Sequence, residues 1–244
     1  MDSWGVTDNG KVRQNNQDVF KIIIDEEKEI AILVVCDGMG GANAGNVASE
    51  LAADVFTSHV NEHIKSETVL DDIAEIVADA AASANTAVFN KGLYDEECNG
   101  MGTTLTALVS SKAGEVIANI GDSRAYHVTA LGITQVTKDH SVVEEMIERG
   151  EITREEARRH PSRNIITRAV GAGMYELTDV FTQEIDTGDL ILLCSDGLSD
   201  LLTEDELCQQ LQNCDSLSEG CEALLEKALS RGAPDNVTVV MFKK

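Results

Sequence analysis

The sequence is short of positive charge. Its 244 residues include 19 Lys and Arg against 43 Asp and Glu, which gives a formal net charge of −24 at pH 7. A protein that binds nucleic acid or an anionic membrane surface needs clustered cationic side chains, and the few cations here are scattered. We therefore expect neither nucleic acid nor a membrane among the partners of this protein.

Long hydrophobic segments are also missing. The longest apolar run, residues 30–36, has seven residues, whereas a membrane-spanning helix needs about 20. The chain starts Met-Asp-Ser-Trp-Gly, without the basic segment and apolar stretch of a secretory signal. Two prolines are present and no linker-like tract divides the chain. We expect one domain over residues 1–244 and a cytoplasmic location.

The cysteines and histidines lack the spacing of metal or disulfide motifs. None of the six cysteines stands in a Cys-x-x-Cys pair, so we interpret them as reduced thiols. Cys36 and Cys194 each end an apolar stretch, which favours buried packing positions. No His-Glu-x-x-His occurs, and His59 and His63 fit a solvated helix face better than a zinc site.

The hydrophobic pattern predicts strands and helices in blocks. Residues 30–36 form a β-branched run that predicts a buried strand stopping at Asp37-Gly38. Apolar residues at helical spacing follow from Ala44 and again over residues 70–88, which predicts two long helices. Four closely spaced runs then predict strands of an antiparallel meander at residues 103–109, 116–120, 125–128 and 133–136.

The rest of the chain continues this alternation of blocks. A segment rich in Glu and Arg, residues 141–163, contains the capping box Thr153–Glu156 and predicts short polar helices in an exposed, mobile excursion. Strands are expected at residues 190–194 and 237–242, and helices at the capping boxes Thr203–Glu206 and Ser216–Glu219. Such blocks favour an α+β fold of layered antiparallel sheets covered by helices.

Isolated acidic residues fall where apolar strands are predicted to start or stop. Asp37 and Asp196 each follow an apolar run and precede a glycine, and Asp235 precedes the last predicted strand. A carboxylate there is costly unless it is paired or binds a cation, and Mg²⁺ and Mn²⁺ prefer carboxylate and carbonyl oxygens. Asp18 and Asp122 are further candidates. Asp-Gly pairs are also common turn formers, so residue types and spacing alone leave a metal site and ordinary turns both open.

Two other local motifs are incomplete. Gly38-Met-Gly40 follows a predicted strand, but a dinucleotide fingerprint needs its third glycine where Asn43 stands. A serine-hydrolase elbow at Ser195 needs a glycine where Leu193 stands. Neither nucleotide binding nor serine-hydrolase chemistry is supported.

Nine short motifs nevertheless occur in order along almost the whole chain. They are Arg13-x-x-Asn16-Gln17-Asp18, Val35-Cys-Asp37-Gly38-Met39-Gly40-Gly41, Gly102-Thr-Thr104, Gly121-Asp122-Ser-Arg124, Asp139-His-Ser141, His160-Pro-Ser-Arg-Asn164, Thr167-Arg168, Ser195-Asp196-Gly197-Leu198 and Asp235-Asn236-Val-Thr238. This series resembles the metal-dependent protein phosphatases of the type 2C (PPM) family in their compact bacterial form. The resemblance implies a central sandwich of two antiparallel β-sheets flanked by helices on both sides, with a metal centre at one edge.

The resemblance also implies which residues hold the ions. Asp37 would bridge two Mn²⁺ or Mg²⁺ ions, and the Gly38 carbonyl would bind one of them. Asp196 and Asp235 would complete the shell of the first ion. Asp18 would act mostly through metal-bound water.

Further roles follow from the same resemblance. Asp122, together with Asp196, matches a third, more weakly held ion, and Arg13 would clamp the substrate phosphate, so that Arg13, Asp37 and Asp196 carry catalysis. Two cations about 4 Å apart would make a bridging hydroxide available for in-line attack on phosphorus, without a phosphoenzyme. Residues 141–165 would form the flap beside the site.

Two positions depart from the family pattern. Animal members have His where this chain has Met39, so the group that protonates the leaving oxygen is unassigned; a metal-bound water and His160 of the flap are both open, beside a purely structural role for His160. Gln17 stands where many members have Glu, which predicts a lower affinity for the second ion.

Three functions are compatible with these residues. The first is a Mn²⁺- or Mg²⁺-dependent phosphatase for phosphoserine and phosphothreonine in proteins. The second is a silent member that binds phosphoproteins without turnover, which the full set of candidate ligands disfavours. The third is a phosphatase for small metabolites. For the first, the expected partners are phosphorylated proteins and an opposing bacterial Ser/Thr kinase of eukaryotic type, and the expected state is a monomer.

Overall fold

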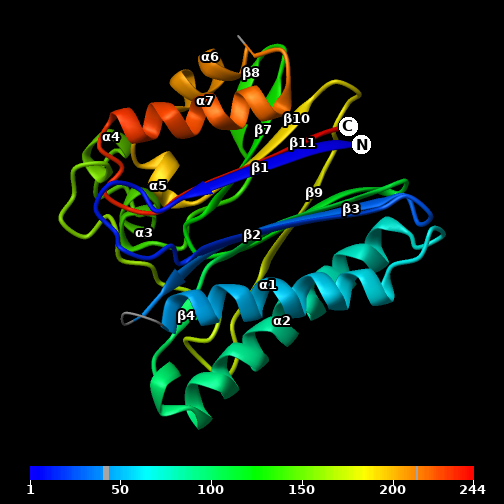
Figure 1. Cartoon of the computed structure of the whole chain (residues 1–244), viewed down its shortest axis with the longest axis horizontal. Helices are drawn as coiled ribbons and strands as arrows, with labels where there is room; N and C mark the ends of the chain where they lie inside the picture. The colour runs from blue at the N-terminus through cyan, green and yellow to red at the C-terminus, as the bar shows by residue number, and fades with distance from the viewer. Residues whose placement is uncertain (41–43, 213) are drawn as a thin grey trace.

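Two antiparallel β-sheets lie face to face in the centre of the molecule, with helices on both outer faces (Figure 1). The structure is a computed structural model that describes residues 1–40, 44–212 and 214–244. Gly41 and Asn43, which the sequence motifs include, lie outside the described residues. The expected α+β sandwich is confirmed. Within the described part of the chain, no helix has both the length and the apolar character needed to cross a membrane.

One sheet, here called sheet A, has its strands in the order β1-β11-β10-β7-β8. The last strand of the chain therefore pairs with the first, and the two chain ends lie together at one end of the sandwich (Figure 1). Sheet A consists of β1 (Asp2–Asp8), β7 (Arg124–Thr129), β8 (Gly132–Gln135), β10 (Leu190–Cys194) and β11 (Val237–Lys243).

The other sheet, sheet B, has the order β2-β3-β5-β6-β9, and the two-residue strand β4 pairs with the end of β3. All of its paired strands are antiparallel. Sheet B consists of β2 (Asp18–Asp25), β3 (Ile30–Met39), β4 (Gly102–Thr103), β5 (Leu105–Ser111), β6 (Gly114–Ile120) and β9 (Asp179–Gln183).

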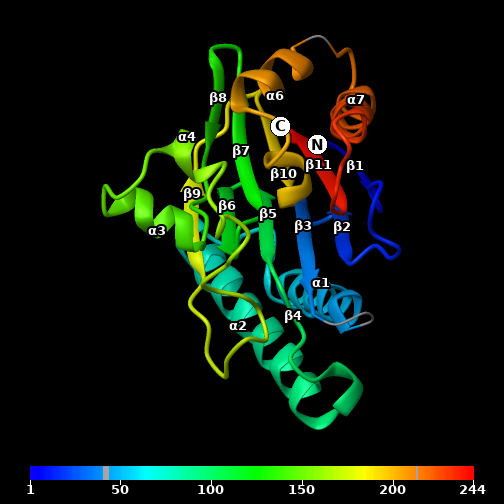
Figure 2. The same ribbon diagram turned by 90° about the vertical axis from the view of Figure 1, so that its left-hand side faces the viewer.

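Helices cover the outer face of each sheet (Figure 2). The two long ones, α1 (Ala44–His63) and α2 (Leu70–Tyr94), pack on sheet B and confirm the two helices expected there. On sheet A lie α6 (Glu204–Leu211) and α7 (Leu217–Ser230). Shorter helices are the 3₁₀ turn η1 (Glu96–Cys98), α3 (Val142–Glu148), α4 (Arg154–Ala157) and α5 (Asp196–Ser199).

Alternation along the central strands explains the layers. In β3, Ile32, Val34 and Cys36 face α1 and α2, while the residues between them, such as Leu33, pack against the other sheet. Successive side chains of a strand point to opposite faces, so an unbroken apolar run is what a strand between a helix layer and a sheet requires. Cys36 and Cys194 are free thiols and fully buried, as expected.

Three strand predictions need correction. The strand predicted at residues 30–36, which is β3, continues through Asp37 to Met39, where it pairs with β4. The predicted strand at residues 103–109 is split into β4 and β5. The predicted meander is wrong: β5 and β6 pair in sheet B, whereas β7 and β8 pair in sheet A. The turn at residues 121–123 therefore crosses from one sheet to the other.

The capping boxes are mostly as predicted. Thr153 with Glu156 and Thr203 with Glu206 form both reciprocal bonds and start α4 and α6. Ser216 caps α7, but the Glu219 side chain accepts from the Asp215 backbone N–H instead of closing a box. The excursion of residues 141–163 contains α3 and α4 as expected, although Val143 and Ala157 are buried in it and it is not exposed throughout.

Candidate metal centre

The strand ends that carry the five predicted acidic residues meet at one end of the sandwich. Asp18 starts β2 and lies directly opposite Asp37 of β3 in the antiparallel register. Asp196 begins α5 just after β10, and Asp235 stands just before β11. Asp122 lies in the turn that crosses between the sheets. Two strand ends from each sheet thus meet where these carboxylates are needed.

A cavity of about 250 Å³ opens between these strand ends. Asp18 is outside the described lining of this cavity; it lies opposite Asp37 and is 5% exposed. The lining brings together most of the residues that the sequence singled out, together with several that it did not: Arg13, Gln17, Asp37, Gly38, Met39, Gly40, Thr104, Asp122, Asn164, Ile166, Asp196, Asp235 and Asn236.

Two glycines allow the backbone segments of the site to approach one another. A Cβ atom on Gly38 would lie 2.2 Å from the carbonyl oxygen of Gly45 in the first turn of α1. A Cβ atom on Gly197 would lie 1.9 Å from the carbonyl oxygen of Asn236. Any larger residue would push these segments apart, so the glycines that follow Asp37 and Asp196 serve close packing.

Hydrogen bonds connect the Asp122 turn to the Asp37 strand. The Asp37 N–H donates to Thr104 Oγ1 at 2.9 Å, and the Thr104 and Ser123 hydroxyls lie 2.8 Å apart. The Gly121 N–H donates to His140 Nδ1 at 3.1 Å. Gly121 itself has φ +108, which the reversal into the second sheet requires. These contacts fix the position of Asp122 beside the cavity.

The carboxylates raise one another's pKa values. Burial raises the pKa of Asp37 well above its usual range, and repulsion from Asp18 and Asp196 raises it further. Burial likewise raises the pKa of Asp196 well above its usual range, with repulsion from Asp122 added. Like charges on directly opposed strand positions are destabilising, so the folded chain stores electrostatic free energy here.

Asp18 combines firm anchoring with an unsatisfied oxygen. The Ser195 and Thr238 hydroxyls both donate to its Oδ2 at 2.7 Å, which lowers its pKa, but burial outweighs them and the pKa is raised to about 6. In the described part of the chain, its Oδ1 atom and the Oδ1 atom of Asp196 are buried without a hydrogen-bond partner. Burial also raises the pKa of Asp122 to about 7. Such orphaned buried carboxylate oxygens require a cation or a proton.

Arg13 supplies a positive charge to the cavity lining. Its Nη2 atom donates to Asp235 Oδ2 at 2.7 Å, and this bond raises the pKa of the guanidinium. The side chain of Arg13 is 55% exposed, so its other donors remain accessible at the mouth of the cavity. One guanidinium cannot offset the charge of five clustered carboxylates.

The donor set therefore fits hard divalent cations such as Mn²⁺ and Mg²⁺, which prefer carboxylate and carbonyl oxygens. In the described part of the chain, no three Asp, Glu, His or Cys side chains converge as closely as the ligands of a bound ion do. One of the candidate ligands, Asp235, is instead bonded to Arg13.

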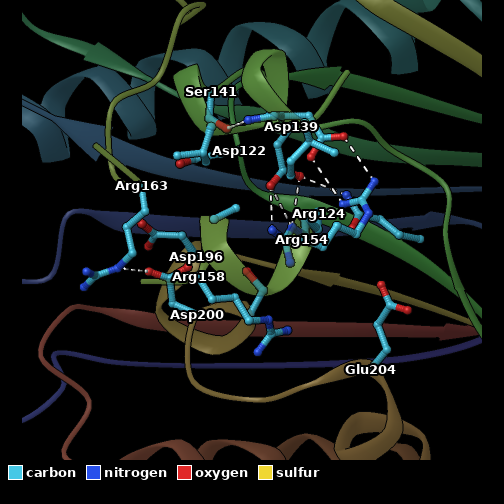
Figure 3. A pocket seen from close by; sticks show the side chains of 16 residues that line it. Asp122, Arg124, Asp139, Ser141, Arg154, Arg158, Arg163, Asp196, Asp200 and Glu204 are labelled. Carbon is cyan, nitrogen blue, oxygen red and sulfur yellow. Dashed lines mark hydrogen bonds and ion pairs between the residues drawn. The ribbon is translucent and has the colours of Figure 1, made fainter. Parts of the chain in front are cut away.

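A second cavity of about 100 Å³ adjoins the first and shares Asp122 and Asp196 with it (Figure 3). The excursion of residues 141–163 covers this cavity from one side and α5 from the other. Arg124 donates to both oxygens of Asp139 at 2.6 to 3.0 Å, and Arg163 lies 3.6 Å from Asp200. The salt bridge between Arg163 and Asp200 thus connects the excursion to the end of α5.

Comparison with known proteins gives the family. The sequence model of protein phosphatase 2C matches residues 8–231. The serine/threonine phosphatase stp of Listeria welshimeri is 37% identical over 98% of this chain and 94% of its own length. The chain belongs to the protein phosphatase 2C family.

Solved structures of protein phosphatase 2C members agree with this assignment. The Mycobacterium tuberculosis serine/threonine phosphatase PstP is similar with a TM-score of 0.87 and 35% identity, covering 98% of this chain and 97% of that one. A catalytic domain of PstP solved in complex with two manganese ions has a TM-score of 0.85 and 34% identity, covering 98% of this chain and 96% of that one. The predicted family and fold are confirmed.

Both positions that depart from the family pattern, Gln17 and Met39, line the cavity. Gln17 lines the cavity, and its carbonyl oxygen accepts the Gly38 N–H at 3.0 Å. His160 is absent from the described lining of the cavity, and its Nδ1 accepts the Ser162 N–H at 3.1 Å. Met39 lines the cavity and is 40% exposed. The structure therefore favours a structural role for His160 in this conformation.

Sequence reasoning missed the residues that hold the site together. The sequence motifs include Thr104, Ser195, Asn236 and Thr238 without assigning them roles, yet each hydrogen-bonds a predicted site residue or its backbone. Asp200 lies one helical turn after Asp196, and repulsion from it raises the pKa of Asp196. The i, i+4 spacing of Asp196 and Asp200 was the available signal for that neighbour.

Proposed function

We propose that this protein is a Mn²⁺- or Mg²⁺-dependent phosphatase that hydrolyses phosphoserine and phosphothreonine in proteins. The observation that carries the proposal is a cavity lined by four carboxylates and Arg13, with Asp18 directly opposite one of the four, Asp37. Among the described residues, one buried oxygen of Asp18 and one of Asp196 have no hydrogen-bond partner. Its relatives named serine/threonine phosphatases support the same conclusion.

The proposed ligands are those implied by the sequence. Asp37 and the Gly38 carbonyl would serve the two-ion centre, with Asp196 and Asp235 completing the first ion's shell and Asp18 acting through water. Asp122, with Asp196, would hold a third ion. Bound cations would make a hydroxide available near neutral pH for direct attack on phosphorus, without a phosphoenzyme.

The side chains of the protein bind and orient the substrate. Arg13 offers planar, paired donors that match two phosphoryl oxygens, which a lysine cannot do. Its present partner Asp235 is a proposed metal ligand, so a cation at Asp235 would leave the guanidinium free for phosphate. Residues 141–165 would act as the flap that borders substrate access, within a single catalytic domain.

The cellular setting is also a proposal. A phosphoprotein phosphatase of this kind would oppose a bacterial Ser/Thr kinase, act as a monomer and work in the cytoplasm. The surface around the cavity, and not the metal centre, would choose the protein substrate, because the centre recognises phosphate alone.

Substrate class can be tested by comparing three phosphomonoesters at millimolar Mn²⁺. We expect a higher kcat/KM for a phosphothreonine peptide than for a phosphotyrosine peptide or a sugar phosphate. A clear preference for the sugar phosphate would favour a metabolite phosphatase, and binding of the peptide without turnover of any substrate would favour the silent member.

A further inference from the structure

The loop that carries Arg13 has no regular structure of its own. Residues 9–17 connect β1 of sheet A with β2 of sheet B and form neither helix nor strand. An irregular loop of this length has many conformations in solution, and ordering each of its residues costs backbone entropy. Contacts with residues outside the loop must therefore hold Arg13 beside the cavity.

The Asn236 side chain makes three hydrogen bonds, all to the backbone of this loop. Its Nδ2 donates to the carbonyl oxygens of Asn9 and Asn15, both at 3.0 Å. Its Oδ1 accepts the Gln17 N–H at 2.8 Å. Asn9 and Asn15 flank Arg13 on opposite sides, and Asn236 is 4% exposed. One buried amide thus holds both arms of the loop.

Backbone packing supports the same attachment. The Lys11 N–H donates to the Ala233 carbonyl at 2.8 Å. Gly10 has φ +71, and a Cβ atom there would lie 2.1 Å from the carbonyl oxygen of Asp235. The loop therefore lies directly on the turn that carries Asp235. Asparagine suits this position because its amide offers two donors and an acceptor, whereas aspartate has no donor.

We propose that Asn236 is a positioning residue for substrate binding, which holds the Arg13 loop in the conformation that clamps the substrate phosphate. This inference rests on the proposed function. Without the amide, the loop would populate other conformations, and apparent substrate affinity would fall in proportion to the fraction that keeps Arg13 in place. The Asn236 backbone N–H, which donates to Asp235 Oδ1 at 2.9 Å, is unchanged by a side-chain substitution.

The test is a double-mutant cycle of Asn236→Ala and Arg13→Ala with a phosphothreonine peptide and Mn²⁺. We expect Asn236→Ala to raise KM about tenfold, with kcat and the half-saturating Mn²⁺ concentration each changed by less than about threefold. In the Arg13→Ala background the same substitution should raise KM by less than about twofold, because the guanidinium that it positions is gone.

Asn85 provides a matched control. Its buried amide also donates to two carbonyls, those of Gly173 and Met174, and accepts the Gly171 N–H, but it holds a different loop. Asn85→Ala should lower the thermal unfolding midpoint comparably while leaving KM within about twofold of wild type. An equal rise of KM in Asn85→Ala would show general loosening and overturn the proposal.

Three further outcomes would also test the proposed role of Asn236. An unchanged KM in a folded Asn236→Ala protein, a rise confined to the Mn²⁺ requirement, or an equal rise in the Arg13→Ala background would each contradict the role. If Asn236→Ala does not fold, Asn236→Asp keeps the acceptor and the volume but loses both donors, and the same cycle applies. If wild type shows no turnover, the proposed function fails instead, and calorimetric binding of the phosphopeptide to the same four proteins tests the clamp alone.

Discussion

Asp18 and Asp37 face each other across two neighbouring strands, and neither has a cationic side chain opposite it. This pairing opposes folding unless positive charge enters between the strands. Selection for stability alone would disfavour this pair of carboxylates, whereas a cation bound between them would offset their repulsion. This pair of opposed carboxylates is therefore the strongest local indication of a metal centre.

Replacing a central ligand should separate metal binding from folding. In Asp37→Asn or Asp196→Asn we expect turnover to fall at least about a thousandfold, because a neutral amide is a poor ligand for a hard cation. The metal-free variant should unfold at the same or a higher temperature than wild type, since a repelled buried charge is removed. Phosphate release and thermal unfolding with and without Mn²⁺ measure both effects. Wild-type rates in either variant at low Mn²⁺ would exclude the assignment.

Arg13 should affect binding of the substrate more than its conversion. Arg13→Ala is expected to raise KM for a phosphothreonine peptide about tenfold or more, because two charge-assisted hydrogen bonds to phosphate are lost. Arg13→Lys should restore only part of the affinity, since an ammonium cannot form the paired geometry. Steady-state kinetics at saturating Mn²⁺ measure this, and an unchanged KM in Arg13→Ala would count against the clamp.

The position of Asp122 depends on how strands β5 to β8 pair, and local sequence signals do not determine that pairing. Strands β5 to β8 were predicted individually because their alternation and turn residues are local signals. Their pairing was predicted wrongly, because a tight turn at Gly121 permits either a hairpin or a crossing between sheets. The crossing is decided by long-range contacts such as those of Ser123 with Thr104 and of His140 with Gly121.

For the site, local patterns identified individual residues but not their arrangement in space. Asp37, Asp196 and Asp235 could be selected from the chain because each stands beside an apolar run and a turn residue. Their convergence required the family resemblance, since spacing cannot say which strand ends meet. Strands β1, β2 and β9 were not predicted at all; they are only partly buried, so their apolar pattern is weak.

Helix α5 packs closely against the start of β11, and a substitution in α5 can test what this contact does. Gly197→Ala would place a Cβ atom against the Asn236 backbone and displace Asp196 from Asp235. We expect the half-saturating Mn²⁺ concentration to rise at least about tenfold, with a lower unfolding midpoint. Gly173→Ala is the control, because its Cβ atom would meet only the Tyr175 carbonyl oxygen at 3.6 Å. Equal Mn²⁺ requirements in Gly197→Ala and wild type would contradict this packing argument.

The cluster of carboxylates makes the free energy of unfolding of the whole molecule depend on pH. Asp18 and Asp122 have folded-state pKa values of about 6 and about 7, above the ordinary value of an unfolded aspartate. The folded metal-free chain therefore binds more protons than the unfolded chain in this range, and its stability falls as pH rises through 6 to 7.

The corresponding measurement is thermal unfolding at pH 6 and pH 8 in EDTA and in Mn²⁺. The metal-free protein should unfold at least about 4 °C higher at pH 6 than at pH 8, and Mn²⁺ should stabilise it more at pH 8, where Asp18 and Asp122 are ionised. A metal-free midpoint that is equal at both pH values, or higher at pH 8, would argue against the clustered, raised pKa values.

The overall charge of −24 is consistent with a phosphatase only if the centre is cationic when it meets its substrate. A phosphate dianion would otherwise be repelled both by the surface and by the cavity lining, and bound divalent ions reverse that local field.

The most direct test is phosphate release from a phosphothreonine peptide by the purified protein in EDTA and in millimolar Mn²⁺, with the Asp196→Asn variant alongside. We expect turnover by wild type in Mn²⁺, none in EDTA, and none by the variant. Undiminished turnover in excess EDTA, or no turnover by folded wild type with any divalent cation, would contradict a metal-dependent phosphatase at this carboxylate cluster.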